Sequence, residues 1–310
     1  MSLPFEIPPT FAAHAGRDER FTRFLEGLPQ LVREVVEDWE LTHDGAPRHG
    51  MAALVVPVRT AGGTPAVLKL NLPHDEARHE HLGLQAWQGN GAVRLLRADP
   101  HRWALLLERL HADEDLRSVD EVEACEIVAG FYERLHVPAL PQLHRLSSYV
   151  ERWTDGLAGL ASDAPVPRRL VEQAVSLGRS FVGDPATDER MIHGDLHYEN
   201  VLAADREPWL VIDPKPMAGD PHYEVAPMLW NRWDEVVASG NVREAVRRRF
   251  FALVDTAMLD EDRARDWVVV RELHNVLWTI EDAARERRAL DADDREWITI
   301  AVAIAKAVQE

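Results

Sequence analysis

The chain contains 310 residues, with 35 basic and 53 acidic side chains and a formal net charge of -18. This excess of negative charge disfavours non-specific binding to nucleic acid or to an anionic membrane, so we expect neither as a partner. Hydrophobic residues make up 46% of the chain, which is enough for a full core in one large or two modest domains. Cys125 is the single cysteine, so no intramolecular disulfide can form and a reducing compartment fits.

The amino-terminal sequence MSLPFEIPPTFAAHAG has neither the basic start nor the continuous apolar stretch of a secretory signal. No apolar run approaches the roughly 20 residues that are needed to span a membrane. We therefore expect a soluble cytoplasmic protein. The sequence does not indicate an oligomeric state.

The first 110 residues predict a small antiparallel sheet with one packed helix. Helical periodicity covers residues 18–39 and 75–87. Alternating apolar residues predict strands at residues 52–60, 66–71, 93–98 and 103–108. Gly62 and Gly63, between the first two strands, are a hairpin signal.

The remainder of the chain predicts mainly helices. Helical periodicity covers residues 119–136, 146–160, 166–182, 223–239, 242–258, 261–288 and 293–308. Two short strand-like pieces, residues 190–193 and 209–213, interrupt these helices. The sequence therefore predicts an α+β protein with a strand-rich lobe (1–110), a larger helical lobe (111–310) and a cleft between them.

The segment MIHGDLHYENVLAADREPWLVIDPKP carries the most specific chemical pattern. Asp195 is followed five positions later by Asn200, and Asp213 stands at the end of the next apolar strand. Phosphoryl transfer requires a carboxylate that orients and deprotonates the attacking hydroxyl, together with oxygen ligands for Mg²⁺. One aspartate, an asparagine five positions on and a second aspartate at a following strand end supply that set.

This segment resembles the aminoglycoside phosphotransferase family, which is related to the protein kinases. HGDLHxxN followed by IDPKP is most similar to its streptomycin 6-kinase and hydroxyurea phosphotransferase branch, and the resemblance extends over residues 52–283. It implies a protein-kinase-like two-lobed fold, with ATP and Mg²⁺ as cofactors. By the same resemblance, Asp195 is the catalytic base and Asn200 and Asp213 are the magnesium ligands. It also implies that His193 supports the catalytic loop.

A kinase also needs a lysine on a strand to bind the nucleotide phosphates, and a glutamate on a helix to position that lysine. Lysine occurs only three times in the chain, and Lys69 lies inside a predicted strand, where a charge needs a partner. The next helix offers Glu76 and Glu80, one turn apart. The family resemblance favours Glu80, with Glu76 as the alternative.

The nucleotide loop and the hinge between the lobes have weaker patterns. The sequence from Gly45 to Gly50 departs from the GxGxxG of protein kinases, so Gly50 is either a nucleotide-loop residue or a plain turn residue. Residues 105–110, with Glu108, are the candidate hinge at which the adenine binds, unless they form only a core strand.

Two further residues near the catalytic segment are candidates for supporting roles. Lys215 follows Asp213 after one proline, so it could offset the charge of nearby carboxylates, contact the transferring phosphate or simply lie on the surface. Asp220, in AGDPHYEVA, matches a family position that braces the active-site loops, and it equally suits a helix N-cap.

The acceptor is expected between the catalytic loop and the C-terminal helices. Helical spacing places His274 on the same face as several aromatic and acidic residues, a combination that suits a cationic ligand. Ordinary core tryptophans and solvated acids would give the same pattern. The substrate candidates are Trp230, Asp234, Trp278, Glu281 and Asp282.

We therefore predict an ATP- and Mg²⁺-dependent O-phosphotransferase for a small molecule, an aminoglycoside such as streptomycin in an antibiotic-resistance reaction. One alternative is a kinase for another metabolite or for hydroxyurea, and another is a non-enzymatic pseudokinase. The third is a metal-dependent hydrolase that uses His193, Asp195 and His197. That last alternative leaves Asn200 and Asp213 without a role.

Overall fold

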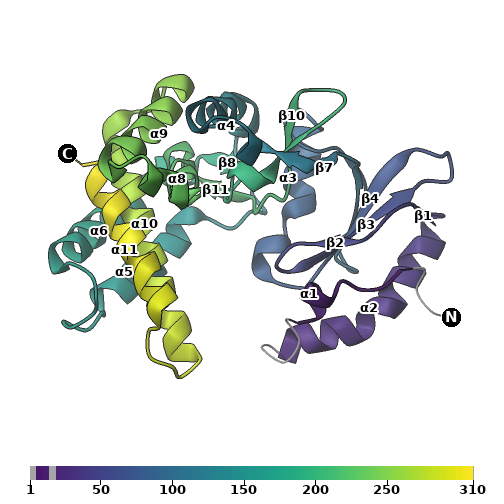
Figure 1. Ribbon diagram of the computed structural model, residues 1–310, viewed down its shortest axis with the longest axis horizontal. Coiled ribbons are helices and arrows are strands. Elements are labelled where there is room, and N and C mark those ends of the chain that lie inside the picture. The colour runs from purple at the N-terminus through teal and green to yellow at the C-terminus, as the bar shows by residue number, and fades with distance from the viewer. Residues whose placement is uncertain (1–4, 14–18, 310) are drawn as a thin grey trace. The chain divides into compact units, whose positions relative to one another are not determined.

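The computed structural model describes residues 5–13 and 19–309 of the chain. The chain divides into two compact units (Figure 1). One contains Met1–Ala112 and Ala203–Ile212, and the other contains Asp113–Leu202 and Asp213–Glu310.

The first unit contains a six-stranded antiparallel sheet with the order β1-β3-β4-β6-β5, and β2 also pairs with β3. Its strands are β1 Thr42–His43, β2 Arg48–His49, β3 Ala53–Arg59, β4 Pro65–Asn71, β5 Leu95–Asp99 and β6 Ala104–Glu108. The four strands that alternation predicts are confirmed, and β3 and β4 form the expected hairpin. Because β4 lies between β3 and β6, most of its residues are buried.

Two helices, α1 (Pro9–Ala12) and α2 (Glu19–Asp38), contribute to the core of this unit. The buried α2 residues Phe21, Leu28, Val32 and Val35 recur at helical spacing and belong to the same apolar cluster as the strand residues of β3 and β4. Each such buried side chain stabilises the fold by about 1.5–3 kcal/mol relative to an exposed one.

The helix predicted at residues 75–87 is shorter than expected. The structure has a 3-10 turn, η1 (Asp75–Ala77), and then α3 (Glu80–Trp87), so the continuous helix is wrong. His79, directly before α3, has a φ of -108° and a ψ of 5°, which lies outside the α region and explains the break.

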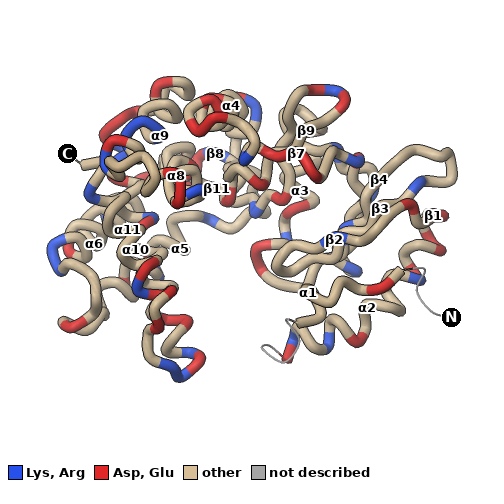
Figure 2. The backbone as a smooth tube through the Cα atoms, viewed as in Figure 1, with Lys and Arg blue, Asp and Glu red and all other residues tan. Residues whose placement is uncertain are grey.

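A second, three-stranded sheet has the order β10-β9-β7. Its strands are β7 His111–Asp115, β9 Val201–Ala203 and β10 Trp209–Val211. Alternation predicts β10 but not β7, because the sequence HADED is polar and its first four residues are exposed. Figure 2 shows the acidic residues of β7 in red.

The second unit is mainly helical, as predicted. Its α-helices are α4 Glu121–Leu135, α5 Leu146–Ala158, α6 Arg168–Val182, α7 Pro227–Trp230, α8 Trp233–Ala238, α9 Val242–Ala257, α10 Glu261–Arg285 and α11 Ala292–Ala307. Its 3-10 turns are η2 Leu116–Ser118, η3 Pro185–Asp188, η4 Tyr198–Asn200 and η5 Pro221–Glu224. The short strands β8 (Arg190–Ile192) and β11 (Met217–Gly219) pair antiparallel.

The long helix α10 lies in the middle of this unit, in contact with α5, α6 and α11 (Figure 1). Its residues from Trp267 to Leu277 are all buried, including the polar side chains Arg271, Glu272, His274 and Asn275. A helix that is surrounded on all sides has no solvent face on which to place polar residues. These four polar side chains therefore need a structural or functional explanation.

The helix predicted at residues 223–239 is wrong, because the structure divides it into η5, α7 and α8. Pro227 begins α7, where a missing N–H is tolerated, and Arg232 has a left-handed φ of +54° directly before α8. The Arg232 guanidinium lies over the Tyr198 ring, 5.0 Å from its centroid, and donates to the Val119 carbonyl. Long-range contacts thus accompany a break that local periodicity does not reveal.

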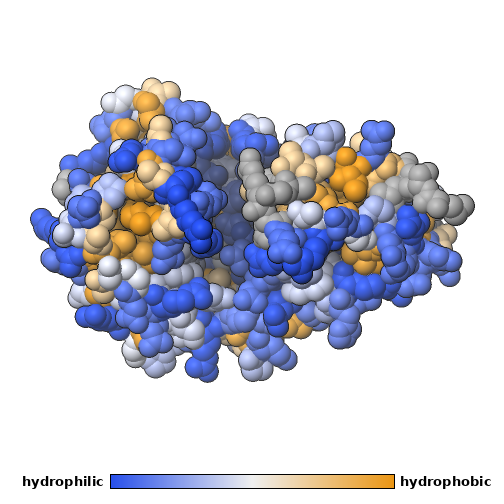
Figure 3. All heavy atoms as spheres, turned by 90° about the horizontal axis from the view of Figure 1, so that it is seen from below, coloured by the Kyte–Doolittle hydropathy of each residue, from blue (hydrophilic) through white to orange (hydrophobic). Residues whose placement is uncertain are grey.

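Hydrophilic residues dominate the face drawn in Figure 3, in agreement with the charged composition. Among the described residues, none of the helices combines the length and the apolar character needed to cross a membrane. Cys125 lies fully buried in α4, as expected for a structural thiol, and burial raises its pKa to about 12.

Candidate active site

The loop after β8 holds Asp195 through a tightly constrained Gly194. Gly194 has a left-handed φ of +85°, and a Cβ atom there would lie 2.5 Å from the Lys215 carbonyl oxygen, so only glycine fits. The buried Glu224 carboxylate accepts from the His193 amide at 3.1 Å and from the Gly194 amide at 2.6 Å. The backbone directly before Asp195 is therefore fixed by charge-assisted hydrogen bonds.

The Asp195 carboxylate is partly exposed and contacts two other polar side chains. Lys215 Nζ donates to Asp195 Oδ2 at 2.8 Å, and His197 Nε2 lies 4.0 Å from the same oxygen. The Asp195 amide donates to Nδ1 of His193, a fully buried residue, at 3.2 Å. The carboxylate is thus accessible, while its backbone is supported from the buried side by His193.

Asn200 lies at the end of η4 with its amide turned toward the catalytic loop. Its Nδ2 donates to the Asp195 carbonyl at 2.8 Å, so its oxygen is the atom suited to a cation. Asp213, which follows β10, has a left-handed φ of +53°. Two residues later, the Lys215 amide donates to the His193 carbonyl at 2.8 Å, which ties this segment to the catalytic loop.

The donor set fits magnesium better than a transition metal. An amide oxygen from Asn200 and a carboxylate from Asp213 are hard ligands of the kind that Mg²⁺ prefers. No group of three histidine, cysteine or acidic side chains with metal-binding geometry occurs among the residues described. The hydrolase alternative, with His193, Asp195 and His197, therefore finds no support.

Glu224 is a residue that the sequence did not single out. His136 Nε2 lies 2.9 Å from its Oε2 atom. Burial opposes ionisation of Glu224, but the hydrogen bond and charge of His136, together with the hydrogen bond from the Gly194 amide, hold its pKa below the ordinary value. The only signal in the sequence is an acid four residues after Asp220, in GDPHYEVA.

Asp220 caps η5 and connects it to α10. Its carboxylate accepts from the His222 amide at 3.0 Å, from Trp267 Nε1 at 2.7 Å and from the Arg263 guanidinium. Burial favours the neutral acid, but His222 and Arg263 together lower the pKa of Asp220. These partners of the Asp220 side chain lie in η5 and α10, whereas Glu224 is among the residues that bind the backbone of the catalytic loop.

Lys69 and Glu80 form a buried ion pair in the first unit. Lys69 Nζ donates to Glu80 Oε1 at 2.6 Å, and Asn71 Nδ2 donates to Glu80 Oε2 at 2.9 Å. Only 6% of Lys69 and 2% of Glu80 are exposed, so Lys69 is not a solvent-facing lysine on an edge strand. Glu80 is the partner that the sequence favoured, and Glu76 lies on the exposed turn η1.

The structure places Gly50 and Glu108 in ordinary structural surroundings. Gly50 lies between β2 and β3, its amide donates to the Ala53 carbonyl, and a Cβ atom there would meet nothing within 4 Å. Glu108, at the end of β6, accepts from the Arg94 amide at 2.7 Å and from Arg206 Nη2 at 2.8 Å. Any role of either residue in nucleotide binding stays a prediction.

The substrate candidates occupy three helices. Trp230 ends α7, Asp234 is exposed on α8, and Trp278, Glu281 and Asp282 lie on α10. Asp282 pairs with Arg285 at 2.9 Å, so one of the proposed acids already has a cationic partner.

An aromatic cluster surrounds Trp278, and the sequence missed one of its members. The Trp153 ring, on α5, lies 4.9 Å from both the Trp278 and the His274 ring centroids. His274 is fully buried, and neither of its ring nitrogens has a hydrogen-bond partner among the described residues. Burial, with a contribution from the Arg271 charge, lowers the pKa of His274 to about 3, so the ring is neutral.

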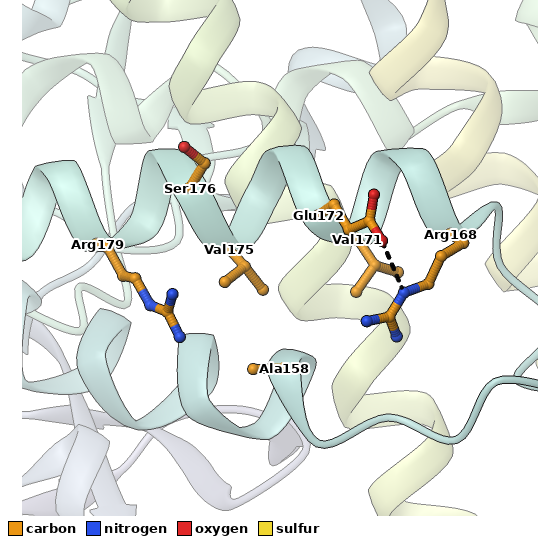
Figure 4. Close-up of a pocket in the computed structure, with 7 residues that line it drawn as sticks. All are labelled: Ala158, Arg168, Val171, Glu172, Val175, Ser176 and Arg179. Carbon is orange, nitrogen blue, oxygen red and sulfur yellow. Dashed lines mark hydrogen bonds and ion pairs between the residues drawn. The ribbon is translucent and has the colours of Figure 1, made fainter.

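A concavity of about 460 Å³ lies elsewhere, on α6 beside Ala158 (Figure 4). It is lined by Arg168, Glu172, Ser176 and Arg179 among others, and Arg168 donates to Glu172 at 3.1 Å. None of the residues of the catalytic loop contributes to it. Its position therefore gives no reason to place the reaction there.

The fold and these side chains define a small-molecule phosphotransferase of the protein-kinase-like class. A sequence model of the aminoglycoside/hydroxyurea antibiotic resistance kinase family matches residues 38–300. Streptomycin 6-kinase from Streptomyces glaucescens is 45% identical over 287 residues, which cover 90% of this chain and 92% of that protein. Hydroxyurea phosphotransferase from Kitasatospora aureofaciens is 40% identical, covering 89% of this chain and 79% of that protein.

Among solved structures, a thermostable mutant of the aminoglycoside phosphotransferase APH(4)-Ia, in complex with ADP and hygromycin B, has the same fold. The TM-score is 0.57 at 15% identity, and the alignment covers 90% of this chain and 98% of that one. The chain belongs to the aminoglycoside/hydroxyurea antibiotic resistance kinase family. It is accordingly an antibiotic-resistance-type kinase that uses a nucleotide and transfers phosphate to a hydroxyl group of a small molecule.

Proposed function

We propose that the protein phosphorylates a hydroxyl group of an aminoglycoside, with streptomycin as the first candidate, using ATP and Mg²⁺. The geometry at Asp195 carries the proposal: an accessible carboxylate on a backbone held by Glu224 and Asn200, in contact with Lys215. The 45% identity to a streptomycin 6-kinase supports the choice of acceptor.

In the proposed reaction, the Asp195 carboxylate accepts a hydrogen bond from the acceptor hydroxyl and takes its proton as the oxygen attacks the γ-phosphorus. A new bond forms between that oxygen and phosphorus, while the bond to the bridging β–γ oxygen breaks and ADP leaves. Asn200 and Asp213 would hold Mg²⁺, which offsets the negative charge of the phosphates. Lys69 would bind the phosphates, with its orientation set by Glu80.

Lys215 is proposed to stabilise the transferring phosphate. In the structure its ammonium group pairs with Asp195, and the side chain is about one-third exposed (34%). A compact ammonium on a flexible stem can exchange one anionic partner for another. Binding of ATP would offer the Lys215 ammonium a second anion, the transferring phosphate, beside the Asp195 carboxylate.

We propose that residues 1–110 bind the nucleotide, with Gly50 and Glu108 in the loop and hinge, and that residues 111–310 provide the catalytic and acceptor sites. The acceptor would contact Trp230, Asp234, Trp278, Glu281 and Asp282. Indoles and exposed carboxylates together favour a cationic molecule through cation–π contact and charge. The enzyme would act in the cytoplasm, where ATP is available.

Hydroxyurea is the second candidate acceptor, because the chain is 40% identical to a hydroxyurea phosphotransferase. The test is a panel of acceptors incubated with ATP and Mg²⁺, in which the release of ADP is measured and the phosphorylated product is identified. Streptomycin, other aminoglycosides, hydroxyurea and small amino alcohols form the panel. Turnover of hydroxyurea alone would replace the first proposal by the second.

A further inference from the structure

Arg271, in the middle of α10, contacts the catalytic loop directly. Its guanidinium donates from Nη2 to the Gly194 carbonyl at 3.3 Å, and only 6% of the residue is exposed. The same guanidinium lies 4.0 Å from the centroid of the Tyr223 ring and 5.6 Å from that of Trp230. Stacking between aromatic rings fixes the plane of a guanidinium, and with it the direction in which its N–H groups point.

The peptide bond that receives this hydrogen bond is the one that joins Gly194 to Asp195. Because a peptide is planar, the Gly194 carbonyl and the Asp195 amide turn together. Arg271 binds the carbonyl end of this plane, and His193 Nδ1 accepts from its amide end at 3.2 Å. Glu224 binds the amide of the preceding peptide at 2.6 Å. Glycine permits backbone rotations that other residues do not, so Gly194 needs such anchors.

Packing alone does not account for an arginine at this position. Burying a guanidinium has a large desolvation penalty, and an apolar side chain of similar volume would contact Tyr223 and Trp230 without it. In addition, Arg271 Nε has no hydrogen-bond partner among the described residues, so part of that penalty is not compensated there. An apolar side chain could not make the hydrogen bond to the Gly194 carbonyl in the catalytic loop.

We propose that Arg271 is a positioning residue, which holds the peptide plane between Gly194 and Asp195 and thereby fixes the direction of the Asp195 carboxylate. This inference rests on the proposed role of Asp195 as the base. It predicts an effect on turnover rather than on nucleotide binding, because Arg271 acts through the backbone of the base. A displacement of about 1 Å at a reacting group can reduce the rate by about 10².

The experiment compares Arg271→Met and Arg271→Lys with the wild-type enzyme. For Arg271→Met we expect kcat to fall about 10- to 100-fold, with KM for ATP within about threefold of wild type. Arg271→Lys should recover part of this loss, because an ammonium can still donate to the Gly194 carbonyl, although it lacks the planar stacking contact. Thermal unfolding of each variant reports whether it is folded.

Arg265→Met is the matched control. Arg265 is on the same helix, also lies over aromatic rings (5.8 Å from the centroids of Phe250 and Phe251) and pairs with Glu261. Within the part of the chain that the structure describes, the hydrogen bond and ring contacts of the Arg265 side chain involve Glu261, Phe250 and Phe251, none of which belongs to the catalytic loop. We expect Arg265→Met to lower stability and to leave kcat at the wild-type level.

Wild-type kcat in a folded Arg271→Met enzyme overturns the inference, and so does an equal loss of kcat in Arg265→Met. If Arg271→Met does not fold, Arg271→Lys decides: kcat reduced at least about fivefold with unchanged KM supports the inference, and unchanged kcat overturns it. Asp195→Asn, measured in parallel, separates the two proposals. An inactive Asp195→Asn enzyme beside a fully active Arg271→Met enzyme refutes only the role of Arg271, whereas an active Asp195→Asn enzyme refutes the role of the base.

Discussion

At the scale of single residues, the catalytic loop is held by side chains that bind its backbone amides and carbonyls. Glu224 binds the amides of His193 and Gly194, and Asn200 binds the carbonyl of Asp195. Each of these hydrogen bonds involves a buried partner, where a lost contact would leave an unpaired polar group. The Asp195 side chain is thereby positioned without being enclosed.

Lys215 provides a test at this scale, because it pairs with Asp195 at 2.8 Å. We expect Lys215→Ala to lower kcat about 10- to 100-fold, the effect of a lost charge-assisted hydrogen bond of about 1.5–3 kcal/mol. Steady-state assays with the best acceptor measure it. Lys306→Ala removes an exposed lysine of α11 and serves as the control for charge. Unchanged turnover in Lys215→Ala would show that Lys215 is only a surface lysine.

The Lys69–Glu80 pair allows stability and function to be separated. Lys69→Met leaves the buried Glu80 carboxylate without its cation, which should destabilise the fold by about 3–5 kcal/mol. Adding Glu80→Gln removes that charge and keeps an acceptor for Asn71, so the double variant should recover most of the stability. The kcat/KM of the double variant for ATP should stay at least about tenfold below that of the wild-type enzyme. Full activity in the double variant would contradict the role of Lys69 in nucleotide binding.

At the scale of elements, the long amphipathic helices and the alternating strands could be predicted from sequence, because burial leaves a local period. The break of the helix predicted at 223–239 could not, since the left-handed Arg232 makes contacts with residues more than 100 positions away. The strand β7 was missed for a similar reason: its acidic residues leave no alternating pattern, and its pairing with β9 is a long-range contact.

The packing of α5 against α6 depends on Gly178. A Cβ atom there would overlap Thr154 Oγ1, whereas a Cβ atom on Gly130, in α4, would meet nothing within 4 Å. We expect Gly178→Ala to lower the free energy of unfolding by about 1–3 kcal/mol through overpacking. Gly130→Ala should raise it by up to about 1 kcal/mol, because alanine is the better helix former. Chemical denaturation measures both, and equal effects of the two substitutions would contradict this packing.

One of the buried polar residues of α10, Glu272, makes the stability of the protein depend on pH. Burial raises the pKa of Glu272 to about 8, against smaller opposing effects of Asn275 and Arg271. The folded state thus keeps a proton on Glu272 that the unfolded chain releases near pH 4.5. The stability that the protonated Glu272 contributes is therefore full below pH 4.5 and is lost as pH rises through about 8.

Glu272→Gln removes this titration. We expect the free energy of unfolding of the variant, relative to wild type, to increase by a few kcal/mol between pH 5 and pH 9. Denaturant titrations at the two pH values measure the difference. A difference between variant and wild type that does not change with pH would show that Glu272 is ionised in the folded state.

At the scale of the whole molecule, the sequence motifs could indicate the class of enzyme but not the contacts that organise its site. HGDLHYEN and IDPKP supply the residues that we propose for direct chemical roles, since chemistry restricts the residue types. Glu224, Arg271 and Trp153 make their contacts with segments distant in the sequence, so the motifs do not include them. Homology then limits the acceptor to a small molecule and leaves its identity to experiment.

The account is tested most directly by the turnover of Asp195→Asn with ATP, Mg²⁺ and the best acceptor of the panel. We expect kcat to fall by about 10²–10⁴, the usual contribution of a general base, while the affinity for ATP and the thermal unfolding midpoint stay close to wild type. Near-normal turnover in this folded variant would contradict the assignment of Asp195 as the base, and with it the proposed mechanism.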